Sequence, residues 1–444
     1  MIGKSLGYSM RDSDGGIAPT IIQVVQKHDK DFHEGKLEAR PSGKGNYTGL
    51  TVTVRAISRE QLDALYSELS AHPMVKAAGS TTEGTGSYTT QSSSSSTRLN
   101  LTPRETPQSL TVMTRQRLDD QRLINLSDTL DATPGIIVLR DGKGSESDGY
   151  FSRGFQIQNF EIDGVPTATR MDNYTQSMAM YDRVEIVRGA TGLISGMGNP
   201  AATINLIRKR PTAEARASVT AEAGNWDRYG SGLDVSGPLT ESGNVRGRLV
   251  ADYKTERSWI DRYKQESQLL YGITEFDLTE DTLLTMGFSY LRTDVDAPAR
   301  SGLPTRFTDG ARSNLSRSLN TAPSWSYNDH EQTSFFTSLE KKFDSGWSAK
   351  AEFTHTENQF DEIFNYVNGS LNADGSGTTQ LPVRFSGTPR QDNLDLYATG
   401  PFNLLGREHE LIAGVTLSKY RERVPSYGGW CCCRSTRSAS WCNS

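Results

Sequence analysis

The part of the chain after residue 211 consists of short segments in which apolar and polar residues alternate. In Val245–Lys254 the odd positions are apolar or small, and most even positions are charged. A period of two places successive side chains on opposite faces of a β-strand, so each segment has one apolar face. The segments with this pattern are Ala217–Ala223, Gly230–Ser236, Val245–Lys254, Leu269–Leu278, Leu283–Leu291, Thr333–Phe343, Trp347–Thr356, Leu394–Thr399 and Glu410–Lys419. They predict about nine antiparallel strands.

Short and long connections alternate between these predicted strands. The short turns are Pro238–Asn244, Thr279–Asp281, Asp344–Gly346 and Phe402–Arg407, and the long polar loops are Glu256–Ser267, Thr293–Glu331 and Glu357–Gln391. Strands of about 9–11 residues with one apolar face, and long loops on one side only, are typical of an outer-membrane barrel. A soluble sandwich also alternates, but it does not confine its long loops to every second connection. We therefore predict part of an antiparallel transmembrane β-barrel over residues 212–425.

Residues 98–211 carry a different, mixed pattern. Ser109–Met113 and Ile136–Leu139 are predicted strands, and four leucines between them, at positions 118, 123, 126 and 130, fit one or two short helices. Phe155–Ile162 alternates and ends at Asp163-Gly164, a strong turn signal. The pattern predicts a small mixed α/β domain.

The last part of that domain, Tyr181–Pro211, is rich in glycine. Two apolar β-rich runs, Val184–Val187 and Thr203–Ile207, enclose glycines at positions 189, 192, 196 and 198. Such spacing fits neither a helix nor a regular strand, and it indicates tight turns and close backbone approach.

Residues 1–78 predict a separate small unit. Ile17–Val25 has the apolar face of a short helix, and Leu50–Ala56 alternates as a strand. Ser58 and Gln61 form a capping box for a second helix with its apolar stripe within Leu62–Leu69, and Met74–Ala77 is a candidate final strand. This α-β-β-α-β order favours a ferredoxin-like α+β unit.

Two further segments have biased composition. Residues 79–97 are rich in Ser, Thr and Gly, which predicts a linker between two unrelated pieces. Residues 426–444 hold all four cysteines, at positions 431, 432, 433 and 442. Adjacent thiols can attract soft metals, but three consecutive cysteines do not have the CxxC spacing of a zinc site. A foreign or frame-shifted end is the favoured interpretation of this tail, which we assign no function.

Composition narrows the possible functions. The 444 residues include no run of about 18 apolar residues, so no transmembrane helix is expected. The net charge of −5 argues weakly against nucleic-acid binding. Three scattered histidines, His28, His33 and His72, do not indicate a metal site. Ser195 lacks the GxSxG context of a hydrolase nucleophile, so an enzyme is not expected.

Three groups of residues resemble the plug domain of TonB-dependent outer-membrane receptors. They are VEIVRGATGL and GMGNPAATIN within Tyr181–Pro211, Arg104–Ser109, and Ser152–Phe155 running on to Ile162–Pro166. The resemblance implies a cell outer-membrane receptor for a ferric siderophore, with outer-membrane lipid and the TonB–ExbB–ExbD system as further partners. It implies no resident cofactor, because iron arrives already chelated. Such receptors close with 22 strands, so about nine strands would be a truncated fragment, which we do not expect to transport iron by itself.

The ligand class follows only from resemblance. SWIDRY, GLP at Gly302–Pro304, TAPSWSYND and LLGREHELIAG are similar to ferric hydroxamate receptors, especially the coprogen and rhodotorulic acid receptor, and pyoverdine receptors share the plug motifs. Aromatic and polar residues in loops are the candidate siderophore contacts: Tyr150, Phe151, Arg170, Tyr174, Trp259, Trp325 and Tyr327. A membrane-girdle or loop-packing role is the alternative for each.

Arg153 and Arg188 each precede a glycine in the plug motifs. In the family such arginines pair with glutamates of the barrel wall and hold the plug in the lumen, so the resemblance implies a plug–barrel lock. The alternative is a solvated surface arginine.

The N-terminal residues are the basis of a rival hypothesis. Met1–Ser5 is followed by polar residues, so no export signal is visible, and no TonB box is recognisable. The stretch KGNYTGLTVTVRAISREQLDALYSELSAHPMVK resembles small bacterial cytosolic proteins of uncharacterised function with an ACT-like fold. The chain is then either a truncated or fused siderophore receptor, which we favour, or a soluble ACT-like small-ligand-binding module carrying a nonfunctional receptor remnant.

Overall fold

The computed structural model describes most of the chain. The described residues are 3–10, 17–30, 32, 37–41, 48–55, 81–90, 92–140, 142–144, 148–168, 177–189, 200–300 and 302–423. Several predictions lie outside them: the second N-terminal helix and final strand, the glycines at 192, 196 and 198, Ser195, Arg170, Tyr174, His33, His72, and the tail 426–444.

The N-terminal unit contains β1 (Gly3–Met10), α1 (Ile17–His28), β2 (Leu37–Pro41) and β3 (Thr48–Arg55). The strands form an antiparallel sheet in the order β1-β3-β2. The predicted first helix and the strand at Leu50–Ala56 are confirmed by α1 and β3. The prediction missed β1, because its sequence GKSLGYSM holds few apolar residues and no clear alternation.

The middle part of the chain is a mixed α/β domain, as predicted. Its elements are β4 (Ser109–Met113), α3 (Arg115–Asp120), α4 (Leu126–Asp131), β5 (Ile137–Leu139), β6 (Gly149–Ser152), β7 (Phe155–Gln156), β8 (Asn159–Ile162), β9 (Val165–Thr167), η2 (Met178–Met180), β10 (Tyr181–Arg188) and β11 (Ala202–Arg208). Five strands form a sheet in the order β4-β10-β11-β8-β9, and β5-β6-β7 form a smaller one. Val184, Ile186 and Ile204 are fully buried in the core of this domain.

Local sequence explains where these elements begin and end. Both helices start after a polar cap: Thr114 accepts a hydrogen bond from the amide of Arg117, and Asn125 accepts one from the amide of Asp128. The predicted strand Phe155–Ile162 is two strands, β7 and β8. The Asp163-Gly164 turn joins β8 to β9, with φ of 52° and 84°, so a residue type that tolerates positive φ is needed at each position.

The last part of the chain is a ten-stranded antiparallel sheet. Its strands are β12 (Arg216–Gly224), β13 (Arg228–Pro238), β14 (Val245–Arg257), β15 (Lys264–Thr279), β16 (Thr282–Asp296), β17 (Tyr327–Lys342), β18 (Ser348–Gly369), β19 (Thr378–Gly387), β20 (Arg390–Leu404) and β21 (Arg407–Arg421). All nine predicted strands are confirmed. The tenth strand, β19, lies in the predicted loop Glu357–Gln391. The C-terminal half of β18 continues into the same predicted loop and pairs with β19 there. Pro382 inside β19 is a signal against a central strand, and β19 pairs with β18 alone.

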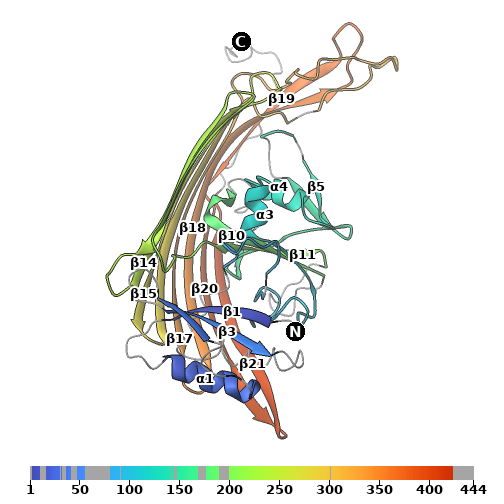
Figure 1. Cartoon of the computed structure of the whole chain (residues 1–444). Coiled ribbons are helices and arrows are strands. Elements are labelled where there is room, and N and C mark those ends of the chain that lie inside the picture. Colours follow the sequence, from blue (N-terminus) through green and yellow to red (C-terminus); the bar gives the residue numbers. More distant parts are fainter. Residues whose placement is uncertain are drawn as a thin grey trace.

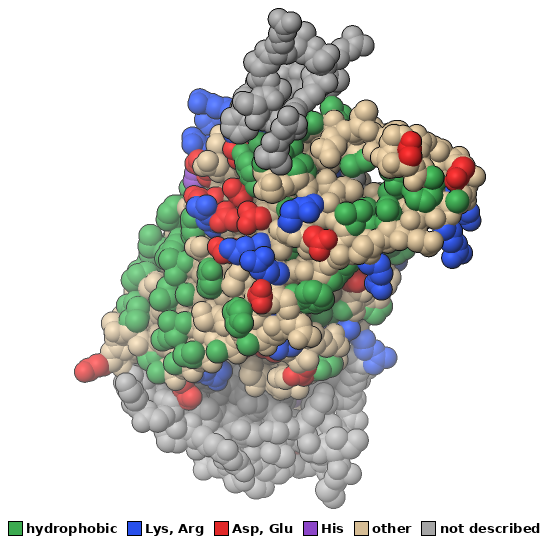
Figure 2. All heavy atoms as spheres, turned by 90° about the horizontal axis from the view of Figure 1, so that it is seen from above, with side chains coloured by type: hydrophobic (Ala, Val, Ile, Leu, Met, Phe, Trp, Pro, Cys, Tyr) green, Lys and Arg blue, Asp and Glu red, His purple; other side chains and the backbone are tan. Residues whose placement is uncertain are grey.

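The ten-stranded sheet is strongly curved, and the mixed domain lies against its concave face (Figure 1). The two faces differ in chemistry. Phe335 and Leu339 are exposed, whereas their sequence neighbours Ser334 and Ser338 are buried. Viewed from above, hydrophobic side chains gather along one flank of the molecule (Figure 2). This arrangement, apolar outside and polar inside, is the pattern of a barrel wall in lipid. Within the described parts of the chain, no helix is long and apolar enough to cross a membrane.

Candidate functional site: the contacts between the mixed domain and the wall

Three consecutive cations at the end of β11, the last strand of the mixed domain, contact the ten-stranded sheet. This sheet is called the wall below. The guanidinium of Arg208 is 2.9 Å from Asp163 within the domain and 3.7 Å from Glu352 on β18. It also lies over the ring of Phe336, 3.8 Å from the centroid. The side chain of Arg208 is 5% exposed, so its charge is paired inside the protein and not solvated.

The next two cations reach other strands. The Lys209 ammonium is 2.9 Å from Asp234 on β13, and the Arg210 guanidinium is 2.7 Å from Glu275 on β15 and 3.8 Å from Glu340 on β17. Together the triplet Arg208–Arg210 contacts carboxylates of four wall strands. The sequence contains a signal for this anchor, a run of cations directly after an apolar strand, but the prediction did not weigh it.

The segment that enters the domain also reaches the wall, at two points. Glu83 accepts hydrogen bonds of 2.6 and 2.7 Å from Arg248 on β14. Arg98 donates to Asp395 on β20, at 2.5 and 3.0 Å, and lies 4.9 Å from the ring centroid of Tyr397. Residues 83 and 98 are therefore fixed to two different strands of the wall.

Between those points the segment covers two buried carboxylates of β10. Asp182 accepts hydrogen bonds from the amides of Thr82 and Glu83, each at 2.9 Å, and from the Thr81 hydroxyl at 2.7 Å. Burial alone would raise the pKa of Asp182, but the Thr82 amide and the Arg183 charge hold it below its usual value.

The second carboxylate, Glu185, is fully buried. It accepts hydrogen bonds from the hydroxyls of Ser93 and Ser95, and the Nε of Arg183 is 2.5 Å from it. Over its described residues the predicted linker 79–97 thus lies against the mixed domain. The physical reason is that its hydroxyls and amides satisfy buried carboxylates, which composition does not reveal.

The two predicted lock arginines lie elsewhere on the domain. Arg188 donates to the carbonyl of Pro134, to Thr111 at 2.7 Å and to Ser109 at 3.1 Å. Partial burial and the nearby charge of Arg153 lower the pKa of Arg188. Arg153 is exposed, with a φ of 54°. Among the described residues neither arginine forms an ion pair with a wall carboxylate, so the predicted lock stays a prediction.

The aromatic ligand candidates are not all accessible. Tyr150 is buried, its ring meets Phe160 edge-on at 6.0 Å, and its hydroxyl is 2.9 Å from that of Ser127. Tyr150 is therefore a core residue, and its prediction as a ligand contact is not supported. Phe151, in β6, is half-buried.

The three wall candidates lie in or next to the loops after β14 and β16. Trp259 is exposed, with the Arg317 guanidinium 5.9 Å from its ring centroid. Trp325 is half-buried, and the Tyr327 hydroxyl donates to Asp361 at 3.2 Å. Tyr327 therefore has a hydrogen-bond partner within the wall, whereas the ring of Trp259 is exposed and accessible to a ligand.

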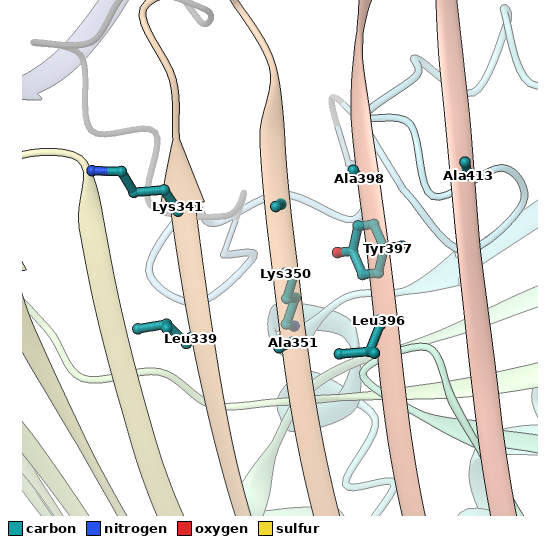
Figure 3. A pocket seen from close by; sticks show the side chains of 9 residues that line it. Leu339, Lys341, Lys350, Ala351, Leu396, Tyr397, Ala398 and Ala413 are labelled. Atoms are coloured by element: carbon teal, nitrogen blue, oxygen red, sulfur yellow. The ribbon is translucent and has the colours of Figure 1, made fainter.

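A depression of about 410 Å³ on the wall is a different kind of feature (Figure 3). Its lining consists of Leu339, Leu396, Tyr397, Lys341, Lys350 and four alanines at positions 349, 351, 398 and 413. A chelated metal requires several convergent polar groups, and most of these lining residues are apolar. The depression therefore does not fit a siderophore site, and it belongs to the apolar face of the sheet.

Comparisons with known proteins give separate matches for the N-terminal segment and for the remainder of the chain. Residues 102–203 match the TonB-dependent Receptor Plug Domain family, and residues 8–78 match the DUF493 family of proteins of unknown function. Over 58 residues the chain is 71% identical to a UPF0250 protein of Janthinobacterium, a match that covers 13% of this chain and 64% of that protein.

The larger part matches receptors named for iron chelates. Over 388 residues the chain is 76% identical to the ferric-pyoverdine BN7/BN8 receptor of Pseudomonas putida, a match that covers 86% of this chain and 48% of that receptor. The solved pyoverdine outer-membrane receptor of Pseudomonas aeruginosa, bound to pyoverdine, superimposes with a TM-score of 0.73 at 42% identity, over 78% of this chain and 51% of that one. The chain spans about half the length of the curated receptors it matches. From residue 102 onward the chain is therefore similar to TonB-dependent receptors over about half of their length, and its N-terminal segment is similar to the DUF493 family.

Proposed function

We propose that this chain is the plug and part of the barrel of an outer-membrane receptor that takes up ferric pyoverdine. The observation that carries the proposal is the 76% identity to the ferric-pyoverdine receptor of Pseudomonas putida, which extends over 388 residues. Of the ligand types left open by the motifs, the pyoverdine type is thus favoured over the coprogen and rhodotorulic acid type.

The physical character of the sheet supports a place in the outer membrane. Its exposed face is apolar and suits lipid, and its concave face carries buried polar groups such as Gln332, Glu352 and Asn393. In the complete protein the ten strands would be part of a closed barrel of 22, because strand edges left open in lipid are costly. The TonB–ExbB–ExbD system would supply the energy for uptake.

The proposed mechanism assigns two tasks to the residues of this chain. The plug blocks the lumen, and the ion pairs of Arg208–Arg210 hold it to the wall. Iron enters already chelated, so binding needs aromatic faces and a few polar groups and no protein ligand to the metal. Phe151, Arg170, Tyr174, Trp259 and Trp325 are the proposed contacts, with Tyr327 nearby.

The N-terminal segment is proposed as a separate domain, residues 1–78, with a ferredoxin-like fold. The antiparallel order β1-β3-β2 around α1 supports this proposal. A second candidate function, a small-ligand-binding module, rests on this segment and its DUF493 match alone. The further proposed boundaries are 98–211 for the plug, 212–425 for the barrel part and 426–444 for the tail.

A chimeric receptor tests the main proposal. Residues 98–423 of this chain replace the matching stretch of the Pseudomonas putida receptor, and uptake of radioactive iron is measured in cells that lack other pyoverdine receptors. We expect uptake of ferric pyoverdine BN7/BN8 at a rate close to that of the parent receptor, and no uptake of ferrioxamine B. A chimera that reaches the outer membrane in normal amount but takes up no ferric pyoverdine would contradict the proposal.

A further inference from the structure

We propose that Lys143 and Gly144, in the β5–β6 loop of the plug, are positioning residues for ligand binding. They hold in place two joined loops of the wall, the β14–β15 loop and the β16–β17 loop, and with them the exposed ring of Trp259. The contacts that carry this proposal lie within this chain. The role of Trp259 in ligand binding rests on the proposed function.

Both plug residues contact the wall. The amide of Ala299, near the start of the β16–β17 loop, donates to the Lys143 carbonyl at 3.0 Å. The side-chain amide of Asn328 on β17 donates to the Gly144 carbonyl, also at 3.0 Å. The Lys143 ammonium is 3.1 Å from Glu256 on β14. Two consecutive residues of the plug therefore bind two wall strands and the loop between β16 and β17.

Gly144 occupies a slot that a larger residue does not fit. Its φ is 69°, in the left-handed region that favours glycine. A Cβ atom at this position would lie 2.6 Å from Cε2 of Tyr263 and 2.6 Å from Cγ1 of Val295. Both side chains are almost completely buried, and the Tyr263 hydroxyl donates to Gln265 at 2.6 Å, so neither side chain has free space to move into. The Lys143 ammonium also lies 5.0 Å from the centroid of the Tyr263 ring. The plug loop thus packs directly against the last residue of the β14–β15 loop.

Asn320 joins the two wall loops to each other. Its side-chain amide donates to the carbonyls of Asp261 and Ala297, each at 2.9 Å, and its side-chain oxygen accepts from the amide of Ala322 at 2.9 Å. The Arg262 guanidinium donates to the carbonyls of Asn320 and Ala322, at 2.7 and 2.9 Å. Because Asn320 is almost completely buried, these hydrogen bonds are shielded from water. A displacement of one loop is therefore transmitted to the other.

The ring of Trp259 belongs to this joined unit. Trp259 lies two residues before Asp261, whose amide donates to the Ser318 carbonyl at 2.8 Å. The Arg317 guanidinium is 5.9 Å from the centroid of the Trp259 ring, so the β16–β17 loop also supplies a partner for the ring itself. A ring that is already held in its binding orientation loses less conformational freedom when a ligand arrives. The plug loop therefore promotes binding by fixing Trp259.

Hydrogen exchange of the full chain in detergent micelles tests whether the plug loop holds the wall loops. The variant Gly144→Ala places a methyl group against Tyr263 and Val295. Gly86→Ala is the matched control, because Gly86 has a similar φ of 62° but a Cβ atom there meets no atom within 4 Å. Both variants thus carry similar backbone strain, and only Gly144→Ala disturbs the contact with the wall.

With Gly144→Ala we expect the amides of Ala299 and Ala322 to exchange about tenfold faster than in the unmodified chain. Lys143→Gln, which removes the charge that faces Glu256, should accelerate the same two amides by a smaller factor. The amides of β15 and β16 should keep their protection, and Gly86→Ala should change none of these rates. The proposal is overturned if neither Gly144→Ala nor Lys143→Gln accelerates the two loop amides without also accelerating those of β15 and β16.

Ligand binding by the chimeric receptor separates positioning from a general loss of stability. The Kd of ferric pyoverdine is measured on whole cells kept on ice, with and without Gly144→Ala. We expect Gly144→Ala to raise the Kd about tenfold in the chimera, and by less than about threefold in a chimera that already carries Trp259→Leu. An equal rise in both would show that Gly144 does not act through Trp259 and would overturn the positioning role. A chimera without substitutions that binds no ferric pyoverdine would instead contradict the proposed function, and hydrogen exchange, which uses no ligand, would then decide whether the plug loop holds the wall loops.

Discussion

The two ends of the plug are attached to the same wall by different chemistry. At its exit, three consecutive cations, Arg208–Arg210, meet carboxylates of four strands, and Arg208 is almost fully buried. At its entry, residues 81–98 depend on hydroxyls and amides, with one ion pair near each end.

The difference lies in how the attachment free energy is distributed among the contacts. A buried cation that loses its partner costs several kcal/mol, about 3–5, so the exit end resists separation. At the entry end the hydroxyls and amides donate to the carboxylates of Asp182 and Glu185, and a hydrogen bond to a charged group contributes about 1.5–3 kcal/mol. The entry end therefore depends on several contacts of moderate strength in addition to its ion pairs.

The largest expected effect is at the exit end. Arg208→Met removes the charge that faces the half-buried Asp163 and the buried Glu352. We expect a loss of about 3–5 kcal/mol in the free energy of unfolding, measured with urea in detergent. Arg390→Met, which removes an exposed ion pair with Glu357, is the control and should cost about 0–1 kcal/mol. Equal losses would contradict the comparison.

Glu161, which interacts with the charge of Arg98, is expected to make the stability of the chain fall as the pH rises. Burial raises the pKa of Glu161 to about 8, against the smaller opposing effect of Arg98. The pKa of Glu161 in the folded chain is thus above its unfolded value. The contribution of Glu161 to stability is therefore fully present below about pH 4.3 and is lost as the pH rises through 8.

Glu161→Gln tests this contribution. The variant should match the unmodified chain near pH 4 and be more stable at pH 9, by on the order of 1.4 kcal/mol for each unit of raised pKa. Urea midpoints at both pH values measure the difference. A variant that is less stable at pH 9 would show that the Glu161 charge is satisfied in the folded plug.

These sites also show what could be predicted from the sequence. Strands such as Val245–Arg257 follow from the period of two, and the β8–β9 turn follows from Asp163-Gly164, because both signals are local. The pair Arg98–Asp395 joins residues 297 positions apart, so no local pattern identifies it. The contacts of residues 81–98 were not predicted for a further reason. Ser and Thr residues can satisfy a buried carboxylate or form a solvated linker equally well, and the local sequence does not distinguish the two.

A smaller effect is expected at the entry end. Asp182→Asn keeps the shape of the side chain but removes the charge that accepts from Thr82 and Glu83, and it should cost about 1–3 kcal/mol at pH 7. The lowered pKa of Asp182 means that its contribution is full above about pH 5 and is lost as the pH falls below its usual value of about 3.9. Urea midpoints of the variant should therefore depend less on pH below 4 than those of the unmodified chain. An unchanged acid dependence would exclude Asp182 as its source.

The smallest effect on this chain is expected for the two predicted lock residues. Arg188 contacts neutral acceptors of the plug and Arg153 is exposed, so Arg153→Ala plus Arg188→Ala should cost only about 0.5–1.5 kcal/mol in unfolding free energy. In the chimeric receptor, with a complete wall, the same pair of changes tests the lock itself. If both arginines pair with wall glutamates there, the variant should admit more of a large antibiotic into whole cells while the barrel assembles normally, as judged by heat-modifiable gel mobility. Normal assembly with unchanged antibiotic entry would return both arginines to a surface role, and it would leave Arg208–Arg210 as the cations that hold the plug.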